Sequence, residues 1–169
     1  RGLFEDGISF RGFLYAGLMI DSDMNPKVLE YNCRFGDPET QPIMLRLKSD
    51  LIEMIQTCFS GSISDFRVEW DQKSAMGVVM SSIGYPESYE TGKEIFGLDR
   101  LTERKGTKVF HSGTRLENND VLTDGGRVLC VTALGDDLKQ SNRNAYSAVQ
   151  EIGWDGKYYR KDIGFRVIK

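Results

Sequence analysis

A change in hydrophobic periodicity near residue 62 is the feature that most limits how this chain can fold. Between residues 42 and 59 apolar side chains recur at helical intervals, whereas beyond residue 62 they follow the pattern of short strands separated by turns. The 169 residues are enough for one medium domain or two small ones. We therefore expect an α+β chain in two parts, residues 1–61 and residues 62–169.

The first part is predicted to be a β-hairpin followed by one helix. Residues 13–20 are an apolar run, residues 21–26 hold the turn formers Asp, Ser, Asn and Pro, and residues 27–33 return as the second strand. The helix is predicted over residues 42–59, with a proline in its first turn and Gly61 after its end.

The second part is predicted to be mostly antiparallel β structure with one or two helices. Residues 74–82 have a strand pattern, residues 85–92 are a turn-rich loop, and residues 108–135 read as strands joined by Asn-Asn-Asp and Asp-Gly-Gly turns. Residues 137–152 carry apolar side chains at helical spacing. A turn and a short strand are expected after that helix.

Composition and charge argue against several classes of protein. The net charge of −3 comes from 22 basic and 25 acidic residues that are interspersed, which is not the pattern of a protein that binds nucleic acid or an anionic membrane. Three separated cysteines and one histidine indicate neither a disulfide framework nor a zinc site, and they favour a reducing, cytoplasmic setting. No apolar run approaches the roughly 18 residues that span a bilayer. Small-molecule chemistry or a protein contact is the better expectation.

The segment VLEYNCRFGDPETQ, residues 28–41, carries too many polar groups for an ordinary buried strand. Strict alternation places Glu30 and Asn32 on one strand face with Val28, and Cys33 on the other face, where we expect it in the core. A carboxylate and an amide oxygen so placed are hard ligands that Mg²⁺ accepts beside substrate phosphates and waters. The alternative is that both side chains are the solvent face of an edge hairpin.

Arg34, Asp37 and Glu39 continue this polar segment, and each also has a structural explanation. Arg34 can pair with a neighbouring carboxylate, and residues 36–39 can form a turn that leads to a helix N-cap at Thr40. Their concentration in one short segment nevertheless predicts a polar site. A guanidinium suits an oxyanion, and a carboxylate suits an amine or a hydroxyl group.

Other polar residues receive a structural interpretation. His111 follows an apolar strand pattern and is expected to be a structural rather than a catalytic histidine. Residues 124–127, Asp-Gly-Gly-Arg, are interpreted as a hairpin turn rather than a phosphate-binding loop. Residues 159–162 are expected at the surface or between domains, with closure over a substrate as the alternative.

Several motifs, taken together, resemble one family. In chain order they are LYAGLMID, NPKVLEYNCRFGDPETQPIMLRLKSDL, GVVMSSIGYP, VFHSGT, GGRVLCVTALG and YRKDIGFR. The chain resembles the C-terminal part of the glycinamide ribonucleotide synthetase (phosphoribosylamine–glycine ligase) family, within the ATP-grasp superfamily. The resemblance implies the C-terminal end of an ATP-grasp domain, a β-hairpin plus helix, followed by a small C-terminal domain.

The resemblance also implies a reaction. It is the ATP-dependent ligation of 5-phosphoribosylamine and glycine to glycinamide ribonucleotide, through a glycyl phosphate, in de novo purine biosynthesis, with Mg²⁺ or Mn²⁺ as the metal. Glu30 and Asn32 match the family's E-x-N metal ligands, and the preceding strand offers no further acidic ligand. Arg34 would be catalytic, facing the acyl phosphate or a substrate phosphate. Asp37 and Glu39 would lie beside the acceptor substrate.

The same resemblance implies that the chain is part of a longer polypeptide. The family's lysines, its flexible phosphate loop and its N-terminal acceptor domain would lie upstream of Arg1. We therefore expect an incomplete, inactive fragment of a monomeric cytoplasmic enzyme, with the rest of the same polypeptide as its partner. Another ATP-grasp carboxylate–amine ligase and a non-catalytic binding module are the alternatives.

Overall fold

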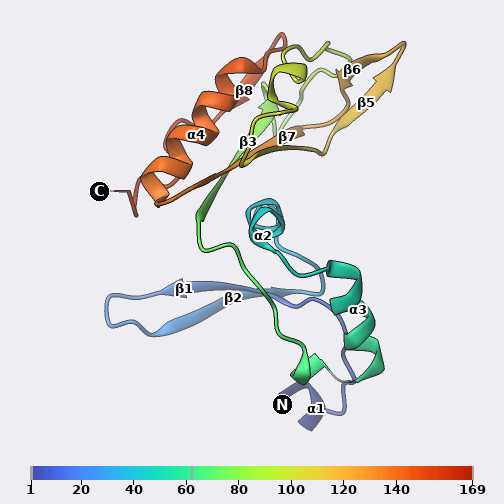
Figure 1. Cartoon of the computed structure of the whole chain (residues 1–169), viewed down its shortest axis with the longest axis vertical. Helices are drawn as coiled ribbons and strands as arrows, with labels where there is room; N and C mark the ends of the chain where they lie inside the picture. The colour runs from blue at the N-terminus through green and yellow to red at the C-terminus, as the bar shows by residue number, and fades with distance from the viewer. Residues whose placement is uncertain (1, 62, 169) are drawn as a thin grey trace. The chain divides into compact units, whose positions relative to one another are not determined.

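The structure, a computed structural model, describes residues 2–61 and 63–168 (Figure 1). It contains two compact units. One comprises the residues up to Thr40 together with Leu47–Trp70, and the other comprises Gln41–Arg46 together with the residues from Asp71 onward. The units thus change over near residue 70, and the short segment Gln41–Arg46 groups with the second unit. The domain boundary predicted between residues 61 and 62 stays a prediction.

The first unit contains the predicted β-hairpin. After a short helix α1 (Gly2–Glu5), strand β1 (Tyr15–Ile20) pairs antiparallel with strand β2 (Pro26–Asn32). The turn between them is held by Asp21, whose carboxylate accepts hydrogen bonds from the backbone N–H groups of Asp23 and Asn25. This is the local side-chain bonding that makes Asp and Asn frequent in turns. The hairpin prediction is therefore confirmed, with β1 starting two residues later than expected.

A β-bulge in the hairpin changes which side chains share a face. Gly17 pairs with Glu30 but the next residue, Leu18, pairs with Val28, so Leu29 is an extra residue on β2. Because Gly17 and Leu18 are consecutive on β1, they lie on opposite faces of the hairpin. Their partners, Glu30 and Val28, therefore also lie on opposite faces. The expectation that Val28 shares a face with Glu30 was therefore wrong, since strict alternation assumes an unbroken ladder.

The single helix predicted over residues 42–59 was wrong, because the structure has two helices. They are α2 (Thr40–Arg46) and α3 (Leu51–Ser60). Between them, Leu47 forms a bridge with Trp70 and the Lys48 N–H donates to the Glu69 carbonyl at 2.9 Å. The backbone there pairs with a distant segment instead of continuing the helix.

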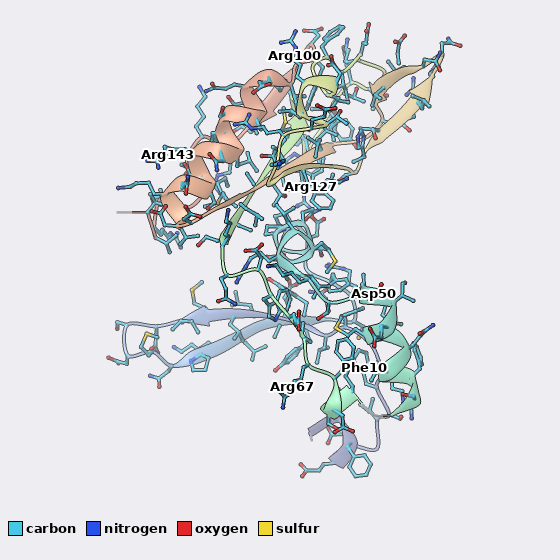
Figure 2. All side chains as sticks on the ribbon, in the orientation of Figure 1. Phe10, Asp50, Arg67, Arg100, Arg127 and Arg143 are labelled. Atoms are coloured by element: carbon cyan, nitrogen blue, oxygen red, sulfur yellow. The ribbon has the colours of Figure 1, made fainter. Side chains whose placement is uncertain are left out.

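Asp50 starts the second helix. Its carboxylate accepts from the N–H groups of Ile52 and Glu53 at 2.8 and 2.9 Å, the geometry of an N-cap. Asp50 is labelled in Figure 2. Gly61, at a φ of 87°, closes the helix with its N–H bonded to the Thr57 carbonyl. The Ser-Asp pair at residues 49–50 was the sequence signal for this break.

We expect Asp50→Ala to lower the free energy of unfolding of the first unit by about 1 kcal/mol, because two N–H groups of the first helical turn lose their acceptor. Urea unfolding followed by far-UV circular dichroism measures the change. Asp50→Asn is the matched control, since asparagine caps equally well. A loss as large for Asp50→Asn as for Asp50→Ala would contradict the capping role.

The second unit is built on a four-stranded antiparallel sheet in the order β4-β7-β3-β8. Its strands are β3 (Ser74–Ser82), β4 (Thr107–His111), β7 (Arg127–Gly135) and β8 (Lys157–Tyr159). A separate hairpin pairs β5 (Thr114–Glu117) with β6 (Asp120–Thr123), and helix α4 (Leu138–Glu151) packs against β3 and β7. Two short 3₁₀ turns are η1 (Ile63–Asp65), in the first unit, and η2 (Asp99–Leu101). The predicted β-rich part with one helix is confirmed.

The hydrophobic core of this unit lies between the sheet and α4. Val78 and Met80 of β3, two residues apart, are fully buried, as are Val131 of β7 and Val149 of α4. The α2 residues Gln41–Arg46 also belong to the second unit. Pro42 packs on β3 where Gly77 leaves room, since a Cβ on Gly77 would lie 3.0 Å from Pro42 Cγ.

The Asp-Gly-Gly segment between β6 and β7 is not the hairpin turn that was predicted. β6 pairs with β5 while β7 pairs with β3 and β4, so the segment carries the chain from one sheet to the other. Its glycines allow close packing instead. A Cβ on Gly125 would lie 3.0 Å from Gly113 Cα, and one on Gly126 would collide with the Tyr85 ring.

The C-terminal segment is tied to α4 by side-chain hydrogen bonds. The Tyr146 hydroxyl donates to the Arg160 carbonyl at 2.7 Å and accepts from the Ile163 N–H at 3.0 Å, and Asn142 donates to the Ile163 carbonyl. Arg160 and Asp162 bond to each other at the surface at 2.9 and 2.8 Å. Among residues 2–61 and 63–168, no helix is long and apolar enough to cross a membrane.

The Arg160–Asp162 pair predicts a small acid dependence of stability. The hydrogen bonds from Arg160 hold the pKa of the Asp162 carboxyl below its ordinary value. The pair's contribution to the free energy of unfolding is therefore fully present above the ordinary carboxyl pKa of about 3.9. It is lost as the pH falls through the lowered pKa of Asp162 in the folded state. Urea unfolding at a series of pH values should show this dependence weakened in Asp162→Asn. The effect is small because the pair is exposed. If Asp162→Asn had the same pH dependence of stability as the parent chain, the role of the pair would be contradicted.

Candidate active site

Glu30 and Asn32 lie on one face of the β1–β2 hairpin, as the sequence predicted. Glu30 pairs across the hairpin with Gly17, and Asn32 pairs with Tyr15, so these four residues share one face. Both ligand candidates lie beyond the bulge at Leu29, and their i, i+2 relation is intact. Within residues 2–61 and 63–168, the Glu30 carboxylate forms no hydrogen bond or ion pair. Its oxygens are available to a ligand.

Two buried glycines make room for the carboxylates of this face. A Cβ on Gly17 would lie 3.0 Å from Glu30 Cγ, so any larger residue would displace that side chain. A Cβ on Gly36 would lie 2.5 Å from Glu39 Oε2 and 2.7 Å from the Tyr15 ring. Glycine at position 36 therefore allows the turn after β2 to fold back onto β1.

Tyr15 joins the turn to the hairpin. Its hydroxyl donates to Glu39 Oε1 at 3.1 Å. The hydrogen bond to Glu39 and the charge of that carboxylate raise the pKa of Tyr15; the Glu30 charge raises it further, whereas the Arg34 charge lowers it. The Tyr15–Glu39 hydrogen bond links the turn to β1, and Arg34 is linked to the hairpin by its hydrogen bond to Asn32.

The orientation of the Asn32 amide suits a metal ligand. Arg34 Nη2 donates to Asn32 Oδ1 over a long 3.4 Å, while Asn32 Nδ2 is buried without a partner in the part of the chain that the structure describes. Turning the amide over would set its N–H groups against the guanidinium, so Oδ1 is the atom on the polar face. A weakly engaged amide oxygen beside a free carboxylate fits a hard divalent cation.

The Glu30–Asn32 pair cannot complete a metal site alone. The described residues hold no group of three or more His, Cys, Asp or Glu side chains that could bind a metal ion. Mg²⁺ typically takes one or two carboxylates and completes its shell with waters and substrate phosphates. The residues present fit that partial role.

Arg34 also borders a cavity in the first unit. It lines a mostly apolar cavity of about 420 Å³ with Cys33, Cys58 and other residues of the first unit. Its Nη1 donates to the Phe35 carbonyl at 2.8 Å, and the Phe35 ring stacks on Phe13 with centroids 3.8 Å apart. The guanidinium is thus held at the boundary between the polar face and this cavity. Cys33 is exposed, so its predicted core position was wrong.

The remaining predicted residues are placed differently. Asp37 is exposed in the turn ahead of α2. His111 is exposed and its Nδ1 lies 3.0 Å from Thr114 Oγ1. The residue that sequence reasoning missed is Tyr15, which the hairpin register of the structure places opposite Asn32.

Comparison with known structures defines the class of protein. The fold is similar to that of biotin carboxylase from Campylobacter jejuni, with a TM-score of 0.58, 11% identity and coverage of 94% of this chain and 37% of that one. Residues 1–40 match the family model "Phosphoribosylglycinamide synthetase, ATP-grasp (A) domain". The chain contains the C-terminal part of an ATP-grasp fold.

The family follows from the closer similarities. Residues 75–166 match the model "Phosphoribosylglycinamide synthetase, C domain". The chain is 52% identical over 170 residues to the phosphoribosylamine–glycine ligases of Salmonella typhimurium and of Escherichia coli strain K12, covering 100% of this chain. The crystal structure of the Thermotoga maritima phosphoribosylamine–glycine ligase gives a TM-score of 0.80 at 34% identity over 95% of this chain. The chain belongs to the phosphoribosylglycinamide synthetase family, and it spans 39% of the length of these relatives.

Proposed function

We propose that this chain is the C-terminal part of an enzyme that joins glycine and 5-phosphoribosylamine to give glycinamide ribonucleotide, with ATP converted to ADP and phosphate. The observation that carries the proposal is that Glu30 and Asn32 share one hairpin face, with Arg34 bonded to Asn32 and Glu39 bonded to Tyr15 of the same face. The matches to relatives that are named phosphoribosylamine–glycine ligases support the choice of substrates. We place the enzyme in the cytoplasm as a monomer.

The reaction would proceed in two steps. A glycine carboxylate oxygen attacks the γ-phosphorus of ATP, the bond to the bridging oxygen breaks, and ADP leaves. The amine nitrogen of phosphoribosylamine then attacks the carbonyl carbon of glycyl phosphate, phosphate departs with the C–O bond pair, and the nitrogen loses a proton. Both steps concentrate negative charge on phosphoryl and carbonyl oxygens, which positioned cations and hydrogen-bond donors stabilise.

The hairpin face supplies the groups for these steps. Glu30 and Asn32 Oδ1 would hold Mg²⁺ or Mn²⁺, which, when bound, offsets charge on the nucleotide phosphates. Arg34 presents further guanidinium N–H donors for the acyl phosphate or a substrate phosphate. Glu39 is oriented by Tyr15 and accepts from the incoming amine, and Asp37 in the exposed turn meets an amine or a hydroxyl.

Two other functions compete with this one. Another ATP-grasp carboxylate–amine ligase would use the same hairpin with a different amine, since none of these side chains identifies the amine by itself. A non-catalytic binding module would not need a free carboxylate, an amide oxygen and a guanidinium on one face. The gathered face therefore favours a ligase over a binding module, and the family relatives favour phosphoribosylamine as the amine.

The test is ADP release by the complete polypeptide that contains this chain. We expect release that requires both glycine and phosphoribosylamine. Release with another amine but not with phosphoribosylamine would favour the second ligase, and no release with any pair would favour the binding module. The 169-residue chain alone is expected to release no ADP, and glycine-dependent release from it would contradict the proposal that further residues complete the site.

A further inference from the structure

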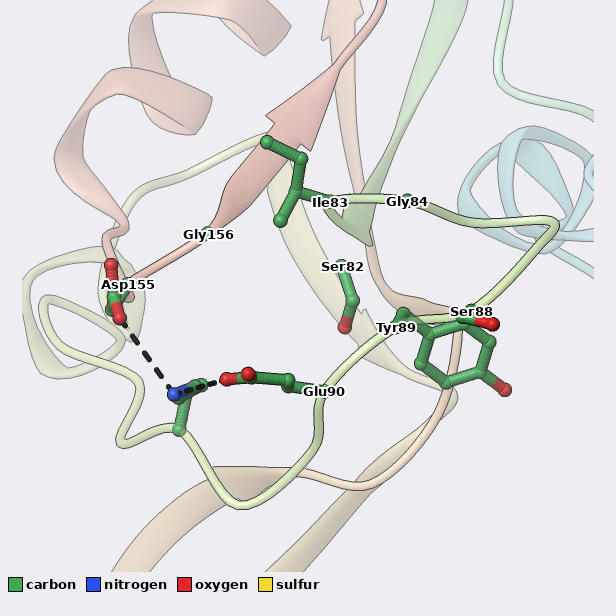
Figure 3. A pocket seen from close by; sticks show the side chains of 9 residues that line it. Ser82, Ile83, Gly84, Ser88, Tyr89, Glu90, Asp155 and Gly156 are labelled. Atoms are coloured by element: carbon green, nitrogen blue, oxygen red, sulfur yellow. Dashed lines mark ion pairs between the residues drawn. The ribbon is translucent and has the colours of Figure 1, made fainter.

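The second unit contains a polar cavity of about 590 Å³, remote in sequence from the hairpin (Figure 3). It lies at the end of β3, where the chain leaves the sheet, and beside the turn that precedes β8. Its size is within the range of small-molecule sites. Six side chains define its chemistry, namely Ser82, Ser88, Tyr89, Glu90, Lys93 and Asp155.

A lysine between two carboxylates forms one wall. Lys93 Nζ lies 2.7 Å from a Glu90 oxygen and 3.7 Å from an Asp155 oxygen, as the dashed lines of Figure 3 mark. Lys93 is about one-third exposed (32%), whereas Glu90 and Asp155 are largely exposed. Each carboxylate therefore keeps oxygen lone pairs for a ligand, and the ammonium, which has three N–H donors, keeps at least one.

The net charge of this wall restricts the ligand. One cation and two anions give −1, which repels a phosphate or another carboxylate. The Lys93 ammonium lies between the two acidic groups and opposes a divalent cation by charge repulsion. A wall with both donors and acceptors suits a neutral molecule that donates and accepts several hydrogen bonds.

The other walls supply hydroxyls and a flat apolar surface. Ser82 is buried, 4% exposed, and its hydroxyl donates to the Gly125 carbonyl at 3.0 Å, which leaves its oxygen free to accept. Tyr89 is 40% exposed, and its ring makes an edge contact with Tyr85 with the ring centroids 6.0 Å apart. A partly exposed aromatic face beside carboxylates packs well against the C–H face of a polyol ring.

The cavity is also held in shape before any ligand arrives. On one side the Ile83 N–H donates to the Gly156 carbonyl at 2.7 Å. On the other, Lys93 and Thr123 exchange hydrogen bonds through N–H, carbonyl and hydroxyl groups at 2.8 and 3.0 Å. Walls fixed in this way spare a ligand the entropic cost of ordering them.

We propose that this cavity binds a neutral polyhydroxylated ring, of the pentose or hexose class. Glu90 and Asp155 accept from neighbouring ring hydroxyls, Lys93 donates to a hydroxyl or ring oxygen, and the Tyr89 face packs against the ring carbons. The site goes beyond the proposed ligation and does not depend on it, because no residue of the hairpin takes part.

The test is a titration of the ¹⁵N-labelled 169-residue chain followed by amide chemical shifts. Separate arms add D-ribose, D-glucose, inorganic phosphate and ethylammonium. We expect saturable shifts at Tyr89, Glu90, Lys93 and Gly156 with at least one of the two sugars, and none at these residues with phosphate or ethylammonium. Because no ATP, glycine or amine substrate is present, the result is independent of the proposed function.

Matched variants locate the binding. Glu90→Gln and Asp155→Asn should each weaken sugar binding by about 5- to 10-fold, since each replaces a charged acceptor by a neutral amide of the same shape. Glu87→Gln, three residues earlier on the same loop and outside the cavity, should change it by less than about twofold. Shifts with phosphate or ethylammonium, no saturable shift with either sugar, or equal weakening by Glu87→Gln would each overturn the proposal.

Discussion

Glu30→Gln and Asn32→Ala, each made in the complete polypeptide of the proposed ligase, are expected to lower turnover by at least about 100-fold at limiting magnesium. The first variant keeps the shape of the side chain but removes the negative charge, and the second removes the amide oxygen. Glu30 is exposed and has no partner to lose among the described residues, and the half-buried Asn32 side chain accepts only one long hydrogen bond there, from Arg34. Steady-state ADP release as a function of magnesium concentration measures the effect, and excess magnesium should restore part of the loss.

Glu53→Gln is the matched control for the charge change. Glu53 is exposed on α3, away from the hairpin face, so turnover and its magnesium dependence should stay unchanged. The urea unfolding midpoints of the 169-residue chain should also agree for all three variants and the parent sequence. Wild-type turnover at limiting magnesium in either ligand variant would show that the metal assignment is wrong.

Gly135→Ala is expected to lower the free energy of unfolding of the second unit by about 3 kcal/mol. Gly135 ends β7 and is buried against the first turn of α4, where an added Cβ would lie 2.8 Å from the carbonyl carbon of Gln140 and would collide with the Ser141 backbone N. The backbone cannot move away easily, because Asp137 caps the helix and accepts from the Gln140 N–H at 2.6 Å. Urea unfolding followed by far-UV circular dichroism measures the loss.

Gly153→Ala provides the control for this prediction. Gly153 does not have a positive φ, and an added Cβ would meet no atom within 4 Å, so the same change should alter stability by less than about 1 kcal/mol. If the two variants were equally stable, the close approach of β7 and α4 would not be the reason for glycine at position 135.

The sequence predicted most elements of the fold because their patterns are local. The hairpin at residues 15–32, the strand at residues 74–82 and the helix from Leu138 follow from turn residues and periodicity. The helix break at residues 47–50 was missed because its cause is partly distant: the backbone there pairs with Glu69 and Trp70. Helical spacing of apolar residues on both sides of the break concealed it.

In the candidate site, too, the local features were predicted from the sequence and the features that depend on distant segments were not. The spacing of Glu30 and Asn32 determined that they share a strand face, since a period of two holds wherever the ladder is unbroken. The bulge that moved Val28 to the other face required the actual register. Tyr15, which orients Glu39 across 24 residues of sequence, became visible only when the hairpin and the turn were both in place.

By itself, then, the sequence determined the α+β class, the hairpin, and the polar residues from Glu30 to Glu39 that resemble those of the family. Only the tertiary structure decided where α2 ends, which side chains meet at the Tyr15 hydroxyl, and that residues 82–93 and Asp155 enclose a polar cavity. The physical reason is that periodicity and turn chemistry act over a few residues. Register shifts, close glycine contacts and cavities depend on segments that meet only after the chain has folded.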